Sequence, residues 1–337
     1  MSIKRAAIHS LVVANNSLGG ANKTKSARFK HGLQLIEFVF MTGRPISDIR
    51  YATAEHLKAW IEFLKLSGIK LATLNNKVAS VRALIGARGV DLVKAGIADS
   101  KALGLEKRIR AGNKIPITDQ AFQVAIDKAM ELNELGFVHV IKLERYLGLR
   151  GLESLMSTHQ LKKFARDAWT MHEHSLQEIH IVDGTKGGRP RHVQPLFEYA
   201  WLTIDVISAA VAFGQSNSGY LLEGPPGTGL KGARARYHRL AAKCGLTGKC
   251  SPHALRYRYA TDKYIELFGQ GVPRKEAERI VLSLIGHGMN RKTLLHQVYL
   301  ATVSHTVPPS TRAEDIAALA AELEAMKAKM TRKKPDA

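Results

Sequence analysis

The 337-residue sequence has few cysteines and no long apolar run. Its two cysteines, Cys244 and Cys250, are too few for a zinc site, which needs four ligands, so we interpret them as free thiols in a reducing compartment. No apolar stretch approaches the roughly 20 residues that span a bilayer, and the short run at residues 11–13 does not resemble a signal peptide. These absences argue against a disulfide-rich secreted domain and a membrane protein, and a cytoplasmic protein is expected.

Acidic residues are also scarce relative to basic ones. The chain has 50 Lys and Arg against 29 Asp and Glu, a net charge of +21, and its first 30 residues contain no acid at all. Such an excess favours a polyanionic partner, above all nucleic acid. A ribosome-associated protein or a merely very soluble one is the alternative, and charge alone says nothing about chemistry.

The pattern of apolar residues predicts a mainly helical protein of two domains. Residues 1–25 are expected to form a flexible basic tail, and residues 26–112 a helical domain. A linker around Gly112 to Pro116 precedes a second domain at residues 116–307. Residues 308–337 are expected to form a last helix with a short heptad pattern.

A polar helix face in the first domain is a candidate DNA contact. Periodicity over residues 71–85 places Leu74, Val78 and Val81 on a buried side. The opposite side is polar and almost uncharged, with arginines beside it, which suits contact with a DNA groove or backbone. A solvated face is the alternative. The candidate DNA-binding residues are Asn76, Lys77, Arg82 and Arg88.

Glycines mark a β-hairpin in the second domain. Residues 178–182 and 191–193 alternate as strands do, and Gly184, Gly187 and Gly188 lie in the turn between them. Lys186 on this turn could reach into a cleft and donate a proton, although a solvated turn lysine is the commoner case.

Two further motifs can bind anions. His253 and Arg256 lie three residues apart on one helix face, where an imidazole beside a guanidinium can hold a phosphate and move a proton. Arg150 stands between leucines and glycines, with Glu153 three residues later, as a partly buried guanidinium that needs an anion. Each motif alone could also have a purely structural role, the first as an ordinary His-x-x-Arg and the second as an Arg–Glu pair within one helix.

In their order along the chain, these motifs, followed by Gly286-His287 and Tyr299, resemble the tyrosine recombinase family of phage and mobile-element integrases. The resemblance covers residues 116–300, with a looser match over 26–110 to the family's core-binding domain. It implies a mainly α fold and a two-domain DNA clamp. A helical, SAM-like core-binding domain would precede a mixed α catalytic domain with a small antiparallel β-sheet. The last helix would dock on a neighbouring subunit.

The resemblance also implies a role for each motif residue. Tyr299 would attack the phosphodiester and form a 3′-phosphotyrosyl link. Arg150 and Arg256 would grip the phosphate oxygens, and Lys186 would protonate the departing 5′-oxygen. His253 would be an acid–base, and His287 would be a further hydrogen-bond donor to the phosphate. The carboxylate of Glu153 would orient the others. No metal or other cofactor is expected.

One spacing departs from the family pattern. The tyrosine usually lies nine residues after the Gly-His histidine, and here that position is His296. Tyr299 comes three residues later, almost one helical turn. No other tyrosine follows His287, so Tyr299 is the predicted nucleophile.

The expected function is site-specific recombination of double-stranded DNA, integrating or excising a mobile element. A homotetramer on DNA is expected, with accessory DNA-bending or directionality proteins as further partners and no membrane. A type IB topoisomerase and a non-catalytic DNA-binding protein are the alternatives. The glycine-rich segment 224–232 resembles a phosphate-binding loop, but Leu230 separates its last glycine from Lys231, so we set nucleotide binding aside.

Overall fold

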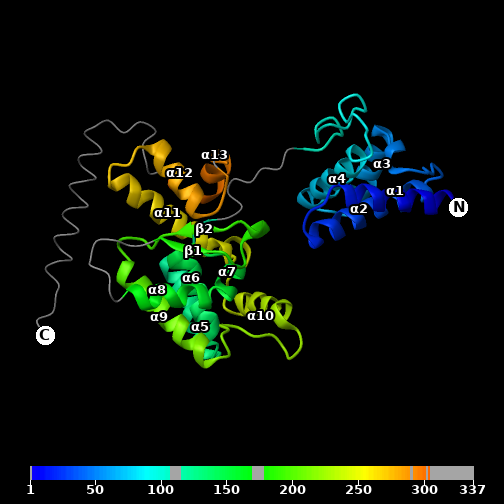
Figure 1. Ribbon diagram of the computed structural model, residues 1–337. Helices are drawn as coiled ribbons and strands as arrows, with labels where there is room; N and C mark the ends of the chain where they lie inside the picture. The colour runs from blue at the N-terminus through cyan, green and yellow to red at the C-terminus, as the bar shows by residue number, and fades with distance from the viewer. Residues whose placement is uncertain (1, 107–114, 169–177, 289–290, 301–302, 304–337) are drawn as a thin grey trace, which may run out of the picture. The chain divides into compact units, whose positions relative to one another are not determined.

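The computed structural model describes residues 2–106, 115–168, 178–288, 291–300 and 303 (Figure 1). The chain divides into two compact units, Met1–Ile109 and Arg110–Ala337, and each has its own hydrophobic core. The described residues are mainly helical, with one two-stranded antiparallel sheet, so the predicted fold class is confirmed. None of the helices among them is long and apolar enough to cross a bilayer. The predicted docking helix at residues 308–337 lies outside the described part of the chain.

The first unit is built from helices that pack side by side. α2 and α4 lie at its centre, with α1 packed on both and α3 against α2 and α4. Trp60 is almost completely buried among the aliphatic side chains between them. The elements are α1 (Ile3–Ser17), α2 (Asn22–Met41), η1 (Ile49–Tyr51), α3 (Ala54–Leu66) and α4 (Leu71–Gly86).

The prediction of a flexible tail over residues 1–25 is wrong, because α1 is part of the first core. Ala7, Leu11 and Ala14 recur at helical spacing and are completely buried. Gly32 on α2 leaves the space that Leu11 occupies, since a Cβ atom there would collide with the leucine. The exposed Val12 and Val13 between these positions obscured the apolar stripe.

The second unit is organised around α6, which packs against α5, α7, α9 and α11. Figure 1 shows the hairpin strands close to α6 and α7. The helices are α5 (Asp119–Glu131), α6 (Leu135–Leu147), α7 (Gly151–Met156), α8 (Thr158–Ala168), α9 (Ala200–Ser216), α10 (Gly229–Lys243), α11 (His253–Gly269), α12 (Arg274–Leu284) and α13 (Lys292–Leu294), with the short turns η2 (Lys186–Gly188), η3 (Gly248–Cys250) and the π-helical turn η4 (Leu295–Tyr299).

The predicted hairpin is present. β1 (Ile179–Ile181) pairs antiparallel with β2 (Arg191–Val193), in a register that places Ile181 opposite Arg191. Both of these side chains point inward, whereas the central histidine of each strand is exposed. At Gly184 the turn approaches α7 so closely that a Cβ atom would lie 2.6 Å from a backbone carbonyl oxygen. The turn that carries Lys186 is therefore held against α7.

Candidate active site

Arg150 lies in the tight turn between α6 and α7. Gly148 ends α6 with a φ of 60°, and a Cβ atom there would collide with the Tyr259 ring, so the turn requires glycine. Arg150 then adopts an extended conformation as the residue before α7. Its backbone N–H donates to Glu153 at 2.7 Å, and its guanidinium binds the same carboxylate. The arginine is thereby fixed through both its backbone and its side chain.

Glu153 is a completely buried carboxylate surrounded by three guanidinium groups. Besides Arg150, Arg191 donates to it at 2.6 Å and Arg256 lies 3.9 Å away. Burial alone would raise the pKa of Glu153, but the hydrogen bond from Arg191 and the charges of all three arginines lower that pKa to about 2. One negative charge thus faces three positive charges, and the cluster carries a net positive charge that a bound anion could balance.

Backbone carbonyl groups at the ends of α6 and α12 hold the same arginines. Arg256 donates to the carbonyl oxygens of Gly148 and Ile285. Arg150 donates to Ile285 at 3.1 Å and to Gly286 at 3.3 Å. Carbonyl groups at helix C-termini lack partners within the helix and carry partial negative charge, so they suit cations. The side chain of Arg256 is 1% exposed, and that of Arg150, at 16%, is the more open to solvent.

Tyr299 and His287 are in direct contact. The phenol oxygen of Tyr299 lies 2.9 Å from Nε2 of His287, and the tyrosine side chain is buried. Burial and the charges of Arg256 and Arg150 lower the pKa of His287 to about 3, so its ring is neutral at physiological pH. A neutral ring can accept a hydrogen bond, and the Tyr299 hydroxyl can donate one. The expected contact of His287 was the phosphate, whereas the structure places its ring on the phenol.

A widened helical turn accommodates the long spacing between these two residues. Tyr299 ends the π-helical turn η4, in which a backbone hydrogen bond spans five residues. The Thr261 hydroxyl on α11 donates to the Tyr299 carbonyl oxygen at 2.7 Å. His296, at the usual family position, is instead 3.0 Å from Glu278 on α12. π turns are rare and often occur at functional sites, and here the turn brings Tyr299 to His287.

His253 and Lys186 lie beside this cluster. His253 begins α11 and is exposed, and its ring packs edge-on against Tyr257 at 5.4 Å between centroids. Tyr257 packs in the same way against Tyr299 at 4.9 Å. Lys186 is exposed on the hairpin turn, and its charge contributes to the lowered pKa of His287. Arg150 and Arg256 pair with Glu153, His287 contacts Tyr299, and the charges of both arginines act on the His287 ring.

Arg191 is the main member of the site that the sequence did not reveal. It lies on β2 with 4% of its side chain exposed, and it donates to Glu153 and to two backbone carbonyl groups. The available signal was its register: an arginine opposite Ile181 occupies an inward position of the strand. Such a charge must find partners inside the fold.

The predicted DNA contacts of the first unit lie in different environments. Asn76 is exposed on α4, and Arg82 is partly buried. Lys77 is buried and donates to a glutamine side chain on α2, so its predicted place on an exposed face is wrong. Arg88 forms an ion pair with Asp48 at 2.7 Å. The long aliphatic stem of a lysine can lie along a core, and a helical pattern does not show this.

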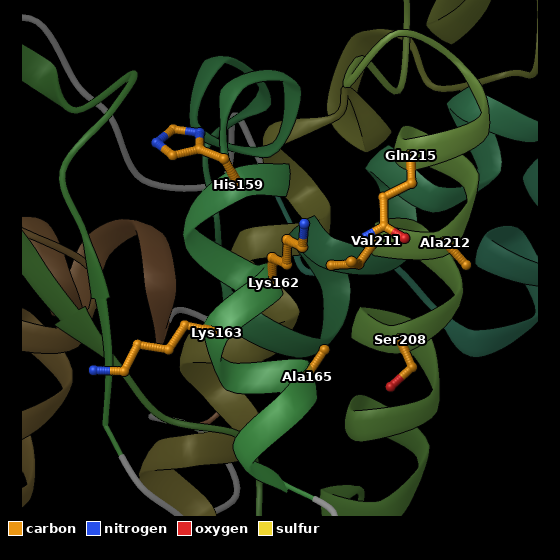
Figure 2. Close-up of a pocket in the computed structure, with 8 residues that line it drawn as sticks. All are labelled: His159, Lys162, Lys163, Ala165, Ser208, Val211, Ala212 and Gln215. Carbon is orange, nitrogen blue, oxygen red and sulfur yellow. The ribbon is translucent and has the colours of Figure 1, made fainter.

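A hollow between α8 and α9 has a volume of about 540 Å³ (Figure 2). His159, Lys162, Ser208 and Gln215 line part of it, and Figure 2 shows Lys163 pointing away from α9. None of the predicted catalytic residues lines this hollow. The predicted catalytic residues thus lie at or beside the arginine cluster and not in this hollow.

Comparisons with known proteins show what this chain is similar to. An integrase family model matches residues 104–262, a range that ends before His287 and Tyr299. The Tn1549 transposon integrase in complex with transposon right end DNA is similar at 13% identity and a TM-score of 0.53, over 94% of this chain and 99% of that chain. The same integrase in complex with circular intermediate DNA is similar at 14% identity and a TM-score of 0.50, over 91% of this chain and 98% of that chain.

A XerA recombinase structure gives 14% identity and a TM-score of 0.36, over 90% of this chain and 99% of that chain. No curated protein matches the sequence. At these identities, the likeness to the transposon integrase shows a shared fold, and the family model adds the integrase signature.

Proposed function

We propose that this chain is a tyrosine recombinase of the integrase family, and that it cleaves and rejoins DNA at specific sites through a covalent 3′-phosphotyrosyl intermediate. One observation carries the proposal. The hydroxyl of Tyr299 lies 2.9 Å from a neutral His287, beside a buried cluster of arginines with a net positive charge. A nucleophile, a proton acceptor and an anion site thus lie together.

The arginines would bind the phosphodiester and its transition state. Arg150 and Arg256 can direct N–H groups at the two non-bridging oxygens, and the guanidinium fork matches phosphate geometry. In a largely buried site these charges act strongly on the charge that builds up as phosphorus becomes five-coordinate. Glu153 holds both arginines in place before DNA arrives.

Tyr299 would be the nucleophile. A phenol has an ordinary pKa of about 10, so attack requires loss of its proton. His287 can accept this proton, although the surrounding cations make it a weak base in the free protein. A bound phosphate would balance those cations and raise the pKa of His287 again. Proton transfer would therefore become favourable only once DNA occupies the site.

The leaving 5′-oxygen needs a proton, and Lys186 on the hairpin turn would supply it. In this step the bond from Tyr299 to phosphorus forms, the bond from phosphorus to the 5′-oxygen breaks, and the lysine proton moves to that oxygen. His253 would assist as a second acid–base. The phosphotyrosyl bond keeps the energy of the broken bond, so rejoining in reverse consumes no ATP, and the proposed step assigns no role to a metal ion.

Double-stranded DNA is the proposed substrate. The exposed side of α10 supports this assignment because it is strongly basic and the helix contains no acid. Its exposed basic side chains are Lys231, Arg234, His238, Arg239 and Lys243. We propose that the protein assembles as a homotetramer on its sites, as the family resemblance implies, and integrates or excises a mobile element with accessory proteins that bend DNA or set direction.

A suicide substrate tests the nucleophile. The DNA site is first selected from a random duplex library with the Tyr299→Phe variant, which should bind without cleaving. A nick placed beside the selected cleavage point then lets the short 5′-hydroxyl fragment diffuse away and traps the covalent complex. Wild-type protein should become attached to DNA and migrate as a slower band in a denaturing gel.

His296→Phe is the matched control, because His296 occupies the usual family position but contacts Glu278. It should still form the adduct, whereas Tyr299→Phe should form none. An adduct from Tyr299→Phe would contradict the assigned nucleophile. Failure of wild-type protein to form an adduct on a site that it binds would contradict the proposed function itself.

A further inference from the structure

Arg191 is a buried cation to which the proposed reaction assigns no role. It lies on β2, and its side chain is 4% exposed. Its guanidinium contacts both oxygens of Glu153, at 2.6 and 3.3 Å, and donates to Gly148 at 3.0 Å and to the Leu284 carbonyl oxygen. Its donors are thus directed at groups of the protein interior.

The neighbouring arginines differ from Arg191 in how they contact Glu153. Arg150 is more exposed to solvent than the other two arginines, and its guanidinium contacts Glu153 through one nitrogen. Arg256 lies 3.9 Å from the carboxylate, beyond hydrogen-bond distance. Of the three guanidinium groups, only that of Arg191 binds Glu153 through two of its nitrogens, the stronger and more directional form of the pair.

Binding of a phosphate would change which cations compensate the charge of Glu153. To bind it, Arg150 and Arg256 must direct N–H groups away from the protein and toward the new anion. A buried carboxylate that lost its cations in this way would be left uncompensated, which is costly. Glu153 therefore needs a partner that does not turn toward the phosphate, and the contacts of Arg191 meet this requirement.

We propose that Arg191 is a positioning residue that acts as the permanent counter-ion of Glu153 and so frees Arg150 and Arg256 to bind the phosphodiester. The inference rests on the proposed function. Burial and repulsion from Arg256 and Arg150 lower the pKa of Arg191 to about 10, which still leaves it charged at neutral pH. The same contacts connect the strand that follows the Lys186 turn to the ends of α6 and α12.

A double-mutant cycle tests this role. The single-turnover rate of adduct formation and the Kd for the selected DNA site are measured for Arg191→Met, Glu153→Gln and the double variant. In Arg191→Met, Glu153 would retain Arg150, so cleavage should fall by about tenfold to a hundredfold, the range for losing one well-placed donor. The Kd should change by less than about threefold, since many other groups bind phosphates.

The double variant distinguishes positioning from packing. Replacing Glu153 with the neutral Gln removes the charge that holds Arg150, so the double variant should cleave at least about threefold faster than Arg191→Met alone. Effects that simply multiply would instead indicate two independent packing losses and would overturn the proposal. Wild-type cleavage rates in Arg191→Met would overturn it as well.

Two more variants guard against misfolding. Arg189→Met removes an exposed cation from the same hairpin and should cleave like wild type. Arg191→Lys keeps the charge, so it should retain more activity than the neutral Arg191→Gln, even if Arg191→Met does not fold. Equal activity of these two variants would overturn the counter-ion role. Because wild-type protein forms the adduct in every one of these outcomes, they leave the proposed function itself intact.

Discussion

Replacing Gly286 with alanine perturbs the site without removing any functional group. Gly286 follows α12 with a φ of 59°, a conformation that costs other residues roughly 1–2 kcal/mol. Its Cβ atom would also lie 2.8 Å from Cδ of Arg191 and 3.3 Å from Nη2 of Arg150. The Arg191 side chain cannot move aside freely, because it is buried and bound to Glu153.

Both costs add to the expected destabilisation. Crowding a packed site typically costs about 1–3 kcal/mol, so the free energy of unfolding should fall by roughly 2–5 kcal/mol in Gly286→Ala. Cleavage should fall by about tenfold or more, since a shift of a few tenths of an ångström in Arg150 misaligns the phosphate. Denaturant unfolding and the suicide substrate measure the two effects.

Gly288→Ala provides a matched control two residues away. Gly288 has no positive φ, and among the described residues a Cβ atom there would meet nothing within 4 Å. This variant should behave like wild type in both assays. If Gly286→Ala matched Gly288→Ala in stability and in cleavage, the close packing of the arginines against Gly286 would be refuted.

Two further predictions follow from the ionisable groups. Lys186→Ala should cleave an ordinary phosphodiester at least about a hundredfold more slowly than wild type. Its cleavage rate should recover on a substrate with a 5′-bridging sulfur, because a thiolate leaves without a proton. Equal losses of rate on both substrates would contradict the assignment of Lys186 as the acid. Burial raises the pKa of Glu144 to about 8 despite a hydrogen bond from Tyr237. Because the folded state keeps a proton that the unfolded state loses, this group should lower stability by up to about 1.4 kcal/mol per pH unit as the pH rises from about 4.5 to 8. Glu144→Gln should abolish that slope in unfolding measured against pH, and an unchanged slope would contradict it.

Local patterns in the sequence predicted those parts of the fold that local interactions determine. The hairpin follows from alternation and from glycines in its turn, and the observed strands lie within the predicted residues. Arg150 and Glu153 were predicted from a short motif, and they form a contact within one turn of chain. In each case the decisive residues lie within a few positions of one another.

The parts that the sequence did not reveal depend on contacts between distant segments. Arg191 meets Glu153 across 38 positions and Leu284 across 93, and no short motif records either contact. Lys77 was assigned to the wrong side of α4 because its polar end finds a glutamine on α2. The polar character of a side chain predicts exposure only where no partner lies inside the fold.

The long spacing between His287 and Tyr299 shows that the active site requires a position of the phenol oxygen and not a fixed number of residues. In a regular α-helix, three residues turn through about 300°, so Tyr299 would point within roughly 60° of His296. The π turn spreads more residues over each turn, and the two side chains diverge to different partners, His287 and Glu278. Chemistry constrains where the phenol oxygen lies relative to the imidazole and the arginines. The number of residues between them can therefore vary, provided that the backbone changes its helical pitch to compensate.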